Sequence, residues 1–348
     1  QLEAARRQQK EFSIITENMQ EGLLVIDRYT MVLSINSSVG KLLKVKEIKT
    51  GESVYLLNRS EEFRGVVGQV LEGKHENKIL RLDGSEIQVI ANPVTRENKT
   101  EGAVILLVDV TEKVEREQLR REFSANVSHE LKTPLTSISG FAEIMQDGFV
   151  KDEDVKVFAG RIYKETQRLI RLVGDVIRIS RLDEGGLPYQ WEKLDLYSLT
   201  HDIFSTLHEA AEKQEVHMYM EGGSTVLDTV PTIMEEVLYN VCDNAVKYNR
   251  RGGEVFVRLK DGEDAVRVNV RDTGIGIPKE DQERIFERFY RVDKSHSKEI
   301  GGTGLGLSIV KHGVKTLNGR LWLNSEPGQG TEIIMEFPKH HMEKEAAE

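Results

Sequence analysis

Apolar residues recur at intervals of three and four through the middle of the chain, as they do along one face of an α-helix. One such stripe occupies 123–145 and a second occupies 155–179. An Asp-Gly pair at 147–148 separates the stripes and a Gly-Gly pair at 185–186 follows, so the pattern predicts two long antiparallel helices. Because one hairpin leaves both stripes partly uncovered, we expect a homodimer in which two hairpins form a four-helix bundle.

Shorter apolar runs alternate with turn residues on both sides of this hairpin. The upstream patterns indicate strands at 23–26, 87–90 and 103–108 and helices at 38–43 and 61–71. The downstream patterns indicate strands at 216–220, 254–260, 265–271, 320–324 and 331–337 and helices at 198–213, 231–248 and 306–317. The first set predicts a small α+β domain, and the second predicts an α/β sandwich.

The expected fold class is therefore a multidomain α+β chain. With 348 residues, of which 39% are hydrophobic, the chain can build more than one core. Its expected segments are an incoming helix at 1–11, the α+β domain at 12–110, a linker helix and hairpin at 111–186, the sandwich at 187–338 and a polar tail at 339–348.

Charge and cysteine content exclude several classes of function. The chain carries 58 acidic and 48 basic residues, a net charge of −10, so no general affinity for nucleic acid is expected. A single cysteine, Cys242, excludes a disulfide framework and a cysteine-based zinc site, and its apolar neighbours predict a buried thiol. No run of about 18 apolar residues occurs, so no membrane span is expected within the sequence. It does not begin with Met, so we expect a fragment of a longer protein, although processing or cloning would leave the same start.

One histidine on the first long helix points away from the apolar stripe. His129 lies two residues from Val127, and at about 100° per residue it faces solvent, as does Thr133 one turn later. A neutral imidazole is a nucleophile near pH 7, and a neighbouring carboxylate such as Glu130 can orient it or accept its proton. From position alone, a surface histidine without a role is the simpler interpretation.

The surrounding segment favours a role. Residues 123–137, FSANVSHELKTPLTS, closely resemble the H box of sensor histidine kinases. The resemblance implies that His129 accepts a phosphoryl group and that Glu130 is its orienting group or base. It also implies that Thr133 belongs to the phosphatase motif of this class.

Two glycine-rich loops in the sandwich are candidates for phosphate binding. Glycines let backbone N–H groups approach a phosphate, and a helix N-terminus favours an anion, although each loop alone is also compatible with a tight turn. Neither loop has the P-loop pattern. Their candidate residues are Asp272, Gly274, Gly276, Gly302, Thr303, Gly304, Leu305 and Gly306.

A polar face on the helix at 231–248 adds to this picture. Asn240, Asn244, Lys247 and Tyr248 share that face, which is also compatible with an ordinary amphipathic helix. An amide oxygen suits Mg²⁺, a lysine suits phosphate, and an aromatic ring can pack on adenine.

Taken together, these segments resemble the boxes of the histidine-kinase catalytic domain. Residues 240–248, 272–278 and 301–308 resemble the N, G1 and G2 boxes in the family's order, and 285–293 resemble the F box. The resemblance implies ATP and Mg²⁺ as cofactors and a lid over ATP at 293–303.

The resemblance also implies a role for each polar residue. Asp272 would accept a hydrogen bond from the adenine amino group, and Asn244 would bind Mg²⁺ with Asn240 nearby. Lys247 would reach the phosphates, and Tyr248 would flank the base. For stabilising the transferring phosphoryl group, the candidates are Arg288 and Arg291.

The family therefore implies a kinase that phosphorylates His129 and passes the group to an aspartate on a response-regulator receiver domain. It implies the cytoplasmic portion of a membrane-anchored bacterial kinase. Three alternatives stay open: an ATPase of the gyrase and heat-shock chaperone type, a serine/threonine kinase of the anti-sigma type, and a non-catalytic pseudokinase scaffold. The first two do not require a histidine on a helical bundle, and the third does not require intact nucleotide boxes.

The first hundred residues resemble a different module. Residues 18–27 and 35–36, with 84–87 and 109–111, resemble parts of a PAS sensor domain. No cysteine lies in 1–110, so a flavin–cysteine adduct is not expected, and the one histidine there, His75, sits in a predicted surface turn, which argues against haem. An unidentified apolar ligand, or none, is expected.

Overall fold

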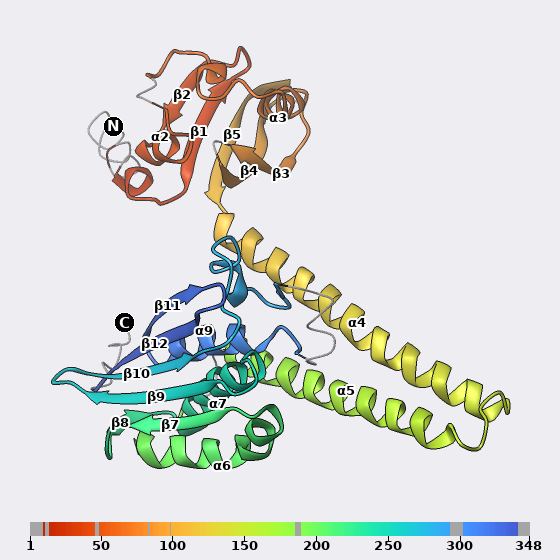
Figure 1. Ribbon diagram of the computed structural model, residues 1–348. Coiled ribbons are helices and arrows are strands. Elements are labelled where there is room, and N and C mark those ends of the chain that lie inside the picture. The colour runs from red at the N-terminus through yellow and green to blue at the C-terminus, as the bar shows by residue number, and fades with distance from the viewer. Residues whose placement is uncertain are drawn as a thin grey trace. The chain divides into compact units, whose positions relative to one another are not determined.

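The computed structural model describes residues 10, 14–45, 49–82, 84–97, 99–184, 189–292 and 302–339. Two compact units make up the chain, Gln1–Glu122 and Phe123–Glu348 (Figure 1). The division falls inside a continuous helix, so the expected boundaries at 110/111 and 186/187 stay a prediction. Nearly all of the expected incoming helix and polar tail lies outside the described residues.

The first unit is built on a five-stranded antiparallel sheet in the order β2-β1-β5-β4-β3. Its elements are β1 (Gly22–Asp27), β2 (Val32–Ile35), α2 (Ser37–Leu42), η1 (Val54–Leu56), α3 (Glu61–Leu71), β3 (Glu76–Leu82), β4 (Ser85–Arg96) and β5 (Lys99–Asp109). The Ser60 side chain caps α3 by accepting a hydrogen bond from the backbone N–H of Phe63, whose ring is fully buried. The predicted strands and helices of this region are confirmed; β2 and β3 were not predicted.

Two long helices form the predicted hairpin, α4 (Thr111–Gln146) and α5 (Val155–Glu184). Pro134 lies inside α4, where it removes one backbone hydrogen-bond donor. Most positions of the two predicted stripes are half-buried or buried within one chain, whereas apolar side chains beside the stripes are exposed. The exposed apolar side chains include Leu135, Ile144, Val157, Tyr163, Ile170, Val173 and Ile177.

The remaining part is a sandwich of one sheet and one helical layer. The sheet order is β11-β12-β10-β9-β7, with a separate β6-β8 pair, and only β7 and β9 pair in parallel among the described strands. The strands are β6 (Glu192–Asp195), β7 (His217–Glu221), β8 (Val226–Thr229), β9 (Glu254–Asp261), β10 (Ala265–Asp272), β11 (Arg320–Glu326) and β12 (Gly330–Pro338). The helices are α6 (Leu196–Gln214), α7 (Pro231–Lys247) and α9 (Gly306–Thr316), with the short η2 (Arg284–Phe286).

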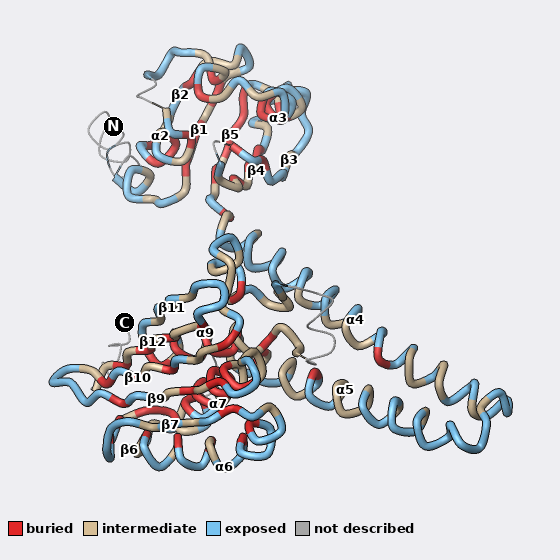
Figure 2. Tube along the Cα trace, in the orientation of Figure 1, coloured by how far each residue is buried: buried red, intermediate tan, exposed pale blue. Residues whose placement is uncertain are grey.

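Buried residues concentrate between this sheet and its helices (Figure 2). Met234 from α7, Val268 from β10 and Met335 from β12 are fully buried there. All predicted strands and helices of the sandwich are confirmed, whereas the four-residue strands β6 and β8 were not predicted. Among the described residues, no helix combines the length and apolar character needed to cross a bilayer.

One glycine sets how closely α9 packs on α7. A Cβ atom at Gly313 would lie 2.4 Å from Cγ2 of Val237 and 3.2 Å from Cγ2 of Ile233. Both contacts are with branched side chains that are themselves buried in the core. The start of α9, which carries the second glycine-rich loop, can therefore approach α7 only with glycine at this position.

We predict that Gly313→Leu lowers the free energy of unfolding by about 1–3 kcal/mol, because the added side chain overpacks the core. The matched control is Gly160→Ala on α5, where an added Cβ meets no heavy atom within 4 Å. This change should raise stability by about 0.5–1 kcal/mol through helix propensity. Urea denaturation of both variants checks the pair, and equal effects of the two would contradict this packing account.

Candidate active site

The N and G2 segments meet at the start of α9. Asn240 on α7 donates a hydrogen bond from Nδ2 to the carbonyl of Glu236 at 2.7 Å. Its Oδ1 lies 2.9 Å from the place where a Cβ of Gly306 would stand, and Nδ2 of Asn244 lies 3.7 Å from the same place. Two amide side chains therefore face the first turn of α9, where a Cβ at position 306 would crowd the Asn240 amide. Amide oxygens are a donor type that Mg²⁺ accepts, so the residues present fit the expected ion.

Lys247, near the C-terminal end of α7, is already engaged. Its Nζ forms an ion pair with Asp243 one turn earlier on the same helix, and both side chains are partly buried. A phosphate reached by Lys247 would have to compete with this carboxylate.

Among the described residues, no group of three or more His, Cys, Asp or Glu side chains could hold a metal ion.

The G1 segment holds Asp272 in a fixed orientation. Oδ1 of Asp272 accepts hydrogen bonds from the backbone N–H groups of Gly274 at 2.8 Å and Thr331 at 3.2 Å. Oδ2 makes no hydrogen bond with the described residues and is free to accept one from a ligand. Burial raises the pKa of Asp272, and the two backbone N–H groups oppose that shift.

Close backbone approaches join this loop to the end of α7. A Cβ at Gly274 would lie 2.3 Å from the carbonyl oxygen of Tyr248, and the N–H of Ile275 donates to that same oxygen at 3.1 Å. Gly276 has a φ of +69°, and a Cβ there would lie 2.0 Å from the carbonyl oxygen of Glu326. The glycines of this motif are therefore required by contacts within the chain itself.

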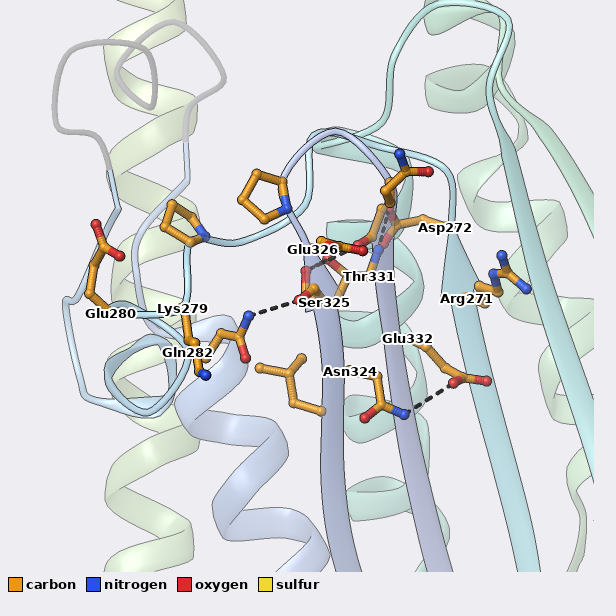
Figure 3. A pocket seen from close by; sticks show the side chains of 15 residues that line it. Arg271, Asp272, Lys279, Glu280, Gln282, Asn324, Ser325, Glu326, Thr331 and Glu332 are labelled. Atoms are coloured by element: carbon orange, nitrogen blue, oxygen red, sulfur yellow. Dashed lines mark hydrogen bonds between the residues drawn. The ribbon is translucent and has the colours of Figure 1, made fainter.

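A hollow of about 740 Å³ lies beside Asp272 (Figure 3). Gln282 crosses it and donates through Nε2 to the carbonyls of Ile277 at 3.0 Å and Ser325 at 2.9 Å. Its lining does not include the four predicted ligand-binding residues of α7, so this hollow is distinct from the face where they gather. The two hydrogen bonds of Gln282 join the loop after Asp272 to the end of β11.

The G2 loop and the F box are joined backbone to backbone. The N–H of Phe289 donates to the carbonyl of Gly304 at 2.9 Å, and a Cβ at Gly304 would lie 2.9 Å from the carbonyl carbon of Phe289. Gly304 has a φ of +74° and Phe289 a φ of +63°. A non-glycine residue in the left-handed region is strained, so the surrounding contacts must hold Phe289 there.

The same loop rests on α5. Leu305 and Ile309 form one buried cluster with Leu172 and Ile179 of α5. Beside it, Oγ1 of Thr303 donates to a carboxylate oxygen of Asp175 at 2.7 Å. Burial raises the pKa of this carboxyl, which the Thr303 hydroxyl and the Arg178 charge partly oppose.

His129 stands where the helical pattern predicted, with 80% of its side chain exposed. Its Nδ1 lies 3.8 Å from Oε1 of Glu130, and the Thr133 hydroxyl donates to the His129 carbonyl at 3.2 Å. Oε2 of Glu130 accepts a hydrogen bond from Arg168 of α5 at 3.3 Å. Arg168 was not identified from the sequence, because it lies 38 residues away on the opposite helix and no motif marks it.

The two candidate arginines of the F box lie in different environments. The guanidinium of Arg288 stacks over the ring of Phe123 at 5.0 Å and lies 3.2 Å from Nε2 of His312. Burial lowers the pKa of Arg291 and the charge of Arg168 adds to this shift, whereas Tyr248 and Glu130 partly oppose it. Nε and Nη2 of Arg291 are buried without a hydrogen-bond partner in the described part of the chain. Arg291 therefore has donors available for a ligand.

Residues 293–301 of the expected lid lie outside the described residues, and only Gly302 and Thr303 of that segment are described. Cys242 is buried as predicted, and burial raises the pKa of its thiol to about 12. His75 is exposed and pairs through Nδ1 with Oδ1 of Asn92 at 2.8 Å.

Comparisons with known proteins agree with this geometry. Residues 119–185 match the His Kinase A (phospho-acceptor) domain, and 229–341 match the family described as histidine kinase-, DNA gyrase B-, and HSP90-like ATPase. The sensor protein kinase WalK of Staphylococcus aureus is 34% identical over 352 residues, which cover 94% of this chain and 80% of that protein. This chain belongs to the sensor histidine kinase family.

WalK of Staphylococcus haemolyticus (strain JCSC1435) is 36% identical over 338 residues, and this chain spans 54% of its length. The histidine kinase ThkA, solved with the response regulator protein TrrA, aligns with a TM-score of 0.51 at 24% identity, over 94% of this chain and 98% of that one. The Acinetobacter baumannii histidine kinase AdeS aligns with a TM-score of 0.52 at 21% sequence identity, over 61% of this chain and 98% of that one. These two structures show the histidine-kinase fold.

We predict that Asp272→Asn stabilises the nucleotide-free kinase by about 1 kcal/mol or less at pH 7, because it removes a buried charge and keeps an oxygen for the two N–H donors. Since the folded pKa of Asp272 is raised above its ordinary 3.8, ionisation destabilises the wild type as pH rises from about 4. The stability gap should therefore be small at pH 4 and widest at neutral pH in urea denaturation.

The matched control for this prediction is Glu263→Gln, which removes an exposed carboxylate from the β9–β10 turn. We expect it to leave stability within about 0.5 kcal/mol at both pH values. A gap between Asp272→Asn and wild type that is the same at pH 4 and pH 7 would show that the buried charge is not its cause.

Proposed function

We propose that this kinase phosphorylates its own His129 with Mg-ATP and passes the phosphoryl group to an aspartate on a response-regulator receiver domain. The observation that carries the proposal is the contact of the F box with the helix that bears His129. The guanidinium of Arg288 lies 5.0 Å above the ring of Phe123 on that helix, and the ring of Phe289 lies 5.8 Å from the same ring. Groups from the nucleotide-binding domain and from the phosphoacceptor helix thus contribute to one site.

We assign the nucleotide contacts to the residues whose polar groups are available in the structure. Oδ2 of Asp272 is available for the adenine amino group, and the backbone of 302–306 with the first turn of α9 is available for phosphates. Asn244, with Asn240 nearby, would hold Mg²⁺, which neutralises phosphate charge when bound. Lys247 would leave its ion pair with Asp243 and bind a phosphate oxygen instead.

The chemistry at His129 needs a neutral imidazole with its proton on Nδ1. The Nε2 lone pair attacks the γ-phosphorus, the bond from that phosphorus to the bridging oxygen breaks, and ADP leaves with that electron pair. The Nδ1 proton of the resulting cationic ring faces Glu130, which orients the ring and accepts the proton. Of the two candidate arginines, we assign stabilisation of the transferring group to Arg291, since Arg288 is engaged with Phe123 and His312.

The assembly and the first unit complete the proposal. The uncovered apolar residues of α4 and α5 support a homodimer, since a second hairpin would bury them. The five-stranded sheet with its helices supports a PAS-like sensor domain at 12–110, followed by the hairpin at 111–186 and the catalytic domain at 187–338. Its place as the cytoplasmic portion of a membrane-anchored kinase is proposed from the family.

We predict that γ-labelled ATP with Mg²⁺ labels the wild type and leaves His129→Gln unlabelled, because the substitution removes the nucleophile. The label should be lost in acid and retained in base, as for a phosphoramidate bond. Binding of a fluorescent ATP analogue should be unchanged, which controls for folding. Acid-stable label, or label that persists in His129→Gln, would contradict a phosphohistidine kinase.

A second activity is favoured by the position of Thr133. Its hydroxyl lies one turn beyond His129 on the same exposed face and is anchored to the His129 carbonyl at 3.2 Å. A hydroxyl fixed there can position a water for hydrolysis of a docked aspartyl phosphate. We therefore propose that the kinase also dephosphorylates its response regulator.

We predict that Thr133→Ala slows dephosphorylation of the phosphorylated regulator by about tenfold or more, because the positioned hydroxyl is lost. Thr133→Ser should restore most of the rate. Thr136→Ala is the matched control, since Thr136 makes the same kind of helix contact, to the carbonyl of Lys132 at 2.9 Å. Equal losses in the Thr133 and Thr136 variants would attribute the effect to the helix and not to the Thr133 hydroxyl.

A further inference from the structure

The two oxygens of the Glu130 carboxylate face different residues. Oε1 lies 3.8 Å from Nδ1 of His129, within ion-pair range but beyond a hydrogen bond. Oε2 accepts a hydrogen bond from Nη2 of Arg168 at 3.3 Å. Nη1 of Arg168 lies 4.0 Å from Glu165 on its own helix, which holds the guanidinium from the other side.

The exposed fraction of the side chain differs sharply among Arg168, Glu130 and His129. The side chain of Arg168 is 16% exposed and that of Glu130 is 31% exposed, whereas His129 is 80% exposed. The Arg168–Glu130 pair is therefore partly shielded from water, and its attraction exceeds that of an ordinary surface pair. His129 by contrast is restrained only lightly, so the carboxylate of Glu130 is the fixed partner of this histidine.

A second guanidinium interacts electrostatically with the same carboxylate. Burial lowers the pKa of Arg291 and the charge of Arg168 lowers it further, whereas the charge of Glu130 opposes that shift. Without Arg168, the carboxylate of Glu130 would be free to turn toward Arg291, whose Nε and Nη2 have no hydrogen-bond partner among the described residues. Oε1 would then be withdrawn from His129.

We propose that Arg168 is a positioning residue for histidine phosphorylation: it holds Oε2 of Glu130 so that Oε1 faces Nδ1 of His129. The inference deepens the proposed function and rests on it. While Nε2 of His129 forms its bond to phosphorus and ADP departs, the proton on Nδ1 passes to Oε1 of Glu130 and then to water. Arg168 touches neither the nucleotide nor the imidazole and acts only through the carboxylate.

The test is a double-mutant cycle in the full chain, with kcat and KM for ATP measured from autophosphorylation rates. Arg168→Ala should lower kcat by about tenfold or more, with KM changed less than about twofold, because only the proton acceptor is misplaced. Arg168→Lys should recover part of the loss by keeping the charge. In a Glu130→Ala background, Arg168→Ala should have almost no further effect.

Lys164→Ala is the matched control, since it removes an exposed positive charge one turn earlier on α5. It should leave kcat and KM unchanged. Circular dichroism and binding of a fluorescent ATP analogue on every variant identify any loss of fold.

Three results would overturn the inference. The first is an unchanged kcat in Arg168→Ala. The second is a loss of kcat on Arg168→Ala that is equally large with and without the Glu130→Ala substitution, which would mean a merely structural role for Arg168. The third is an effect confined to KM. In each of these cases the proposed function still stands, provided that His129 of the wild type becomes labelled. If His129 of the wild type never becomes labelled, both the inference about Arg168 and the proposed function are contradicted.

Discussion

The contact between α5 and the start of α9 determines where the nucleotide loops lie relative to the histidine. Leu305 and Ile309 are fully buried in it, against Leu172 and Ile179 of the hairpin. Because the G2 loop immediately precedes α9, any displacement of this contact would also move the loop. Phe289 extends the contact to α4, where its ring lies 5.8 Å from that of Phe123. The nucleotide boxes are thus brought to the helix that carries the phosphoacceptor.

Strain and buried charge make this contact costly as well as specific. Phe289 adopts a left-handed backbone conformation, which costs about 1–3 kcal/mol and persists only because its neighbours hold it. Asp175 and Glu236 are both desolvated at the edge of the contact, which raises the pKa of each, and Arg178 bridges them. A small apolar centre bordered by such polar groups is typical of a transient interface more than of a permanent one.

The sequence predicted what local pattern controls. The three- and four-residue spacing located α4 and α5, and the boxes located Asn240, Asp272 and Gly306. The contact of Glu130 with Arg168 was not predictable, because it depends on how two helices align across the turn near 147–154. Our preference for Arg291 over Arg288 likewise depends on tertiary contacts, those of Arg288 with Phe123 and His312. Strands β6 and β8 were not predicted, because four residues carry too little periodicity to be recognised as a strand.

The most direct test of this arrangement is the distance between α5 and α9 in the nucleotide-free kinase. Spin labels on exposed positions, through Arg171→Cys and Lys311→Cys, report it, and Cys242 stays unlabelled because its thiol is buried with a pKa of about 12. We predict one short, narrow distance distribution that broadens when Leu172→Asp places a charge in the contact. A broad distribution that Leu172→Asp leaves unchanged would show that α9 does not rest on α5.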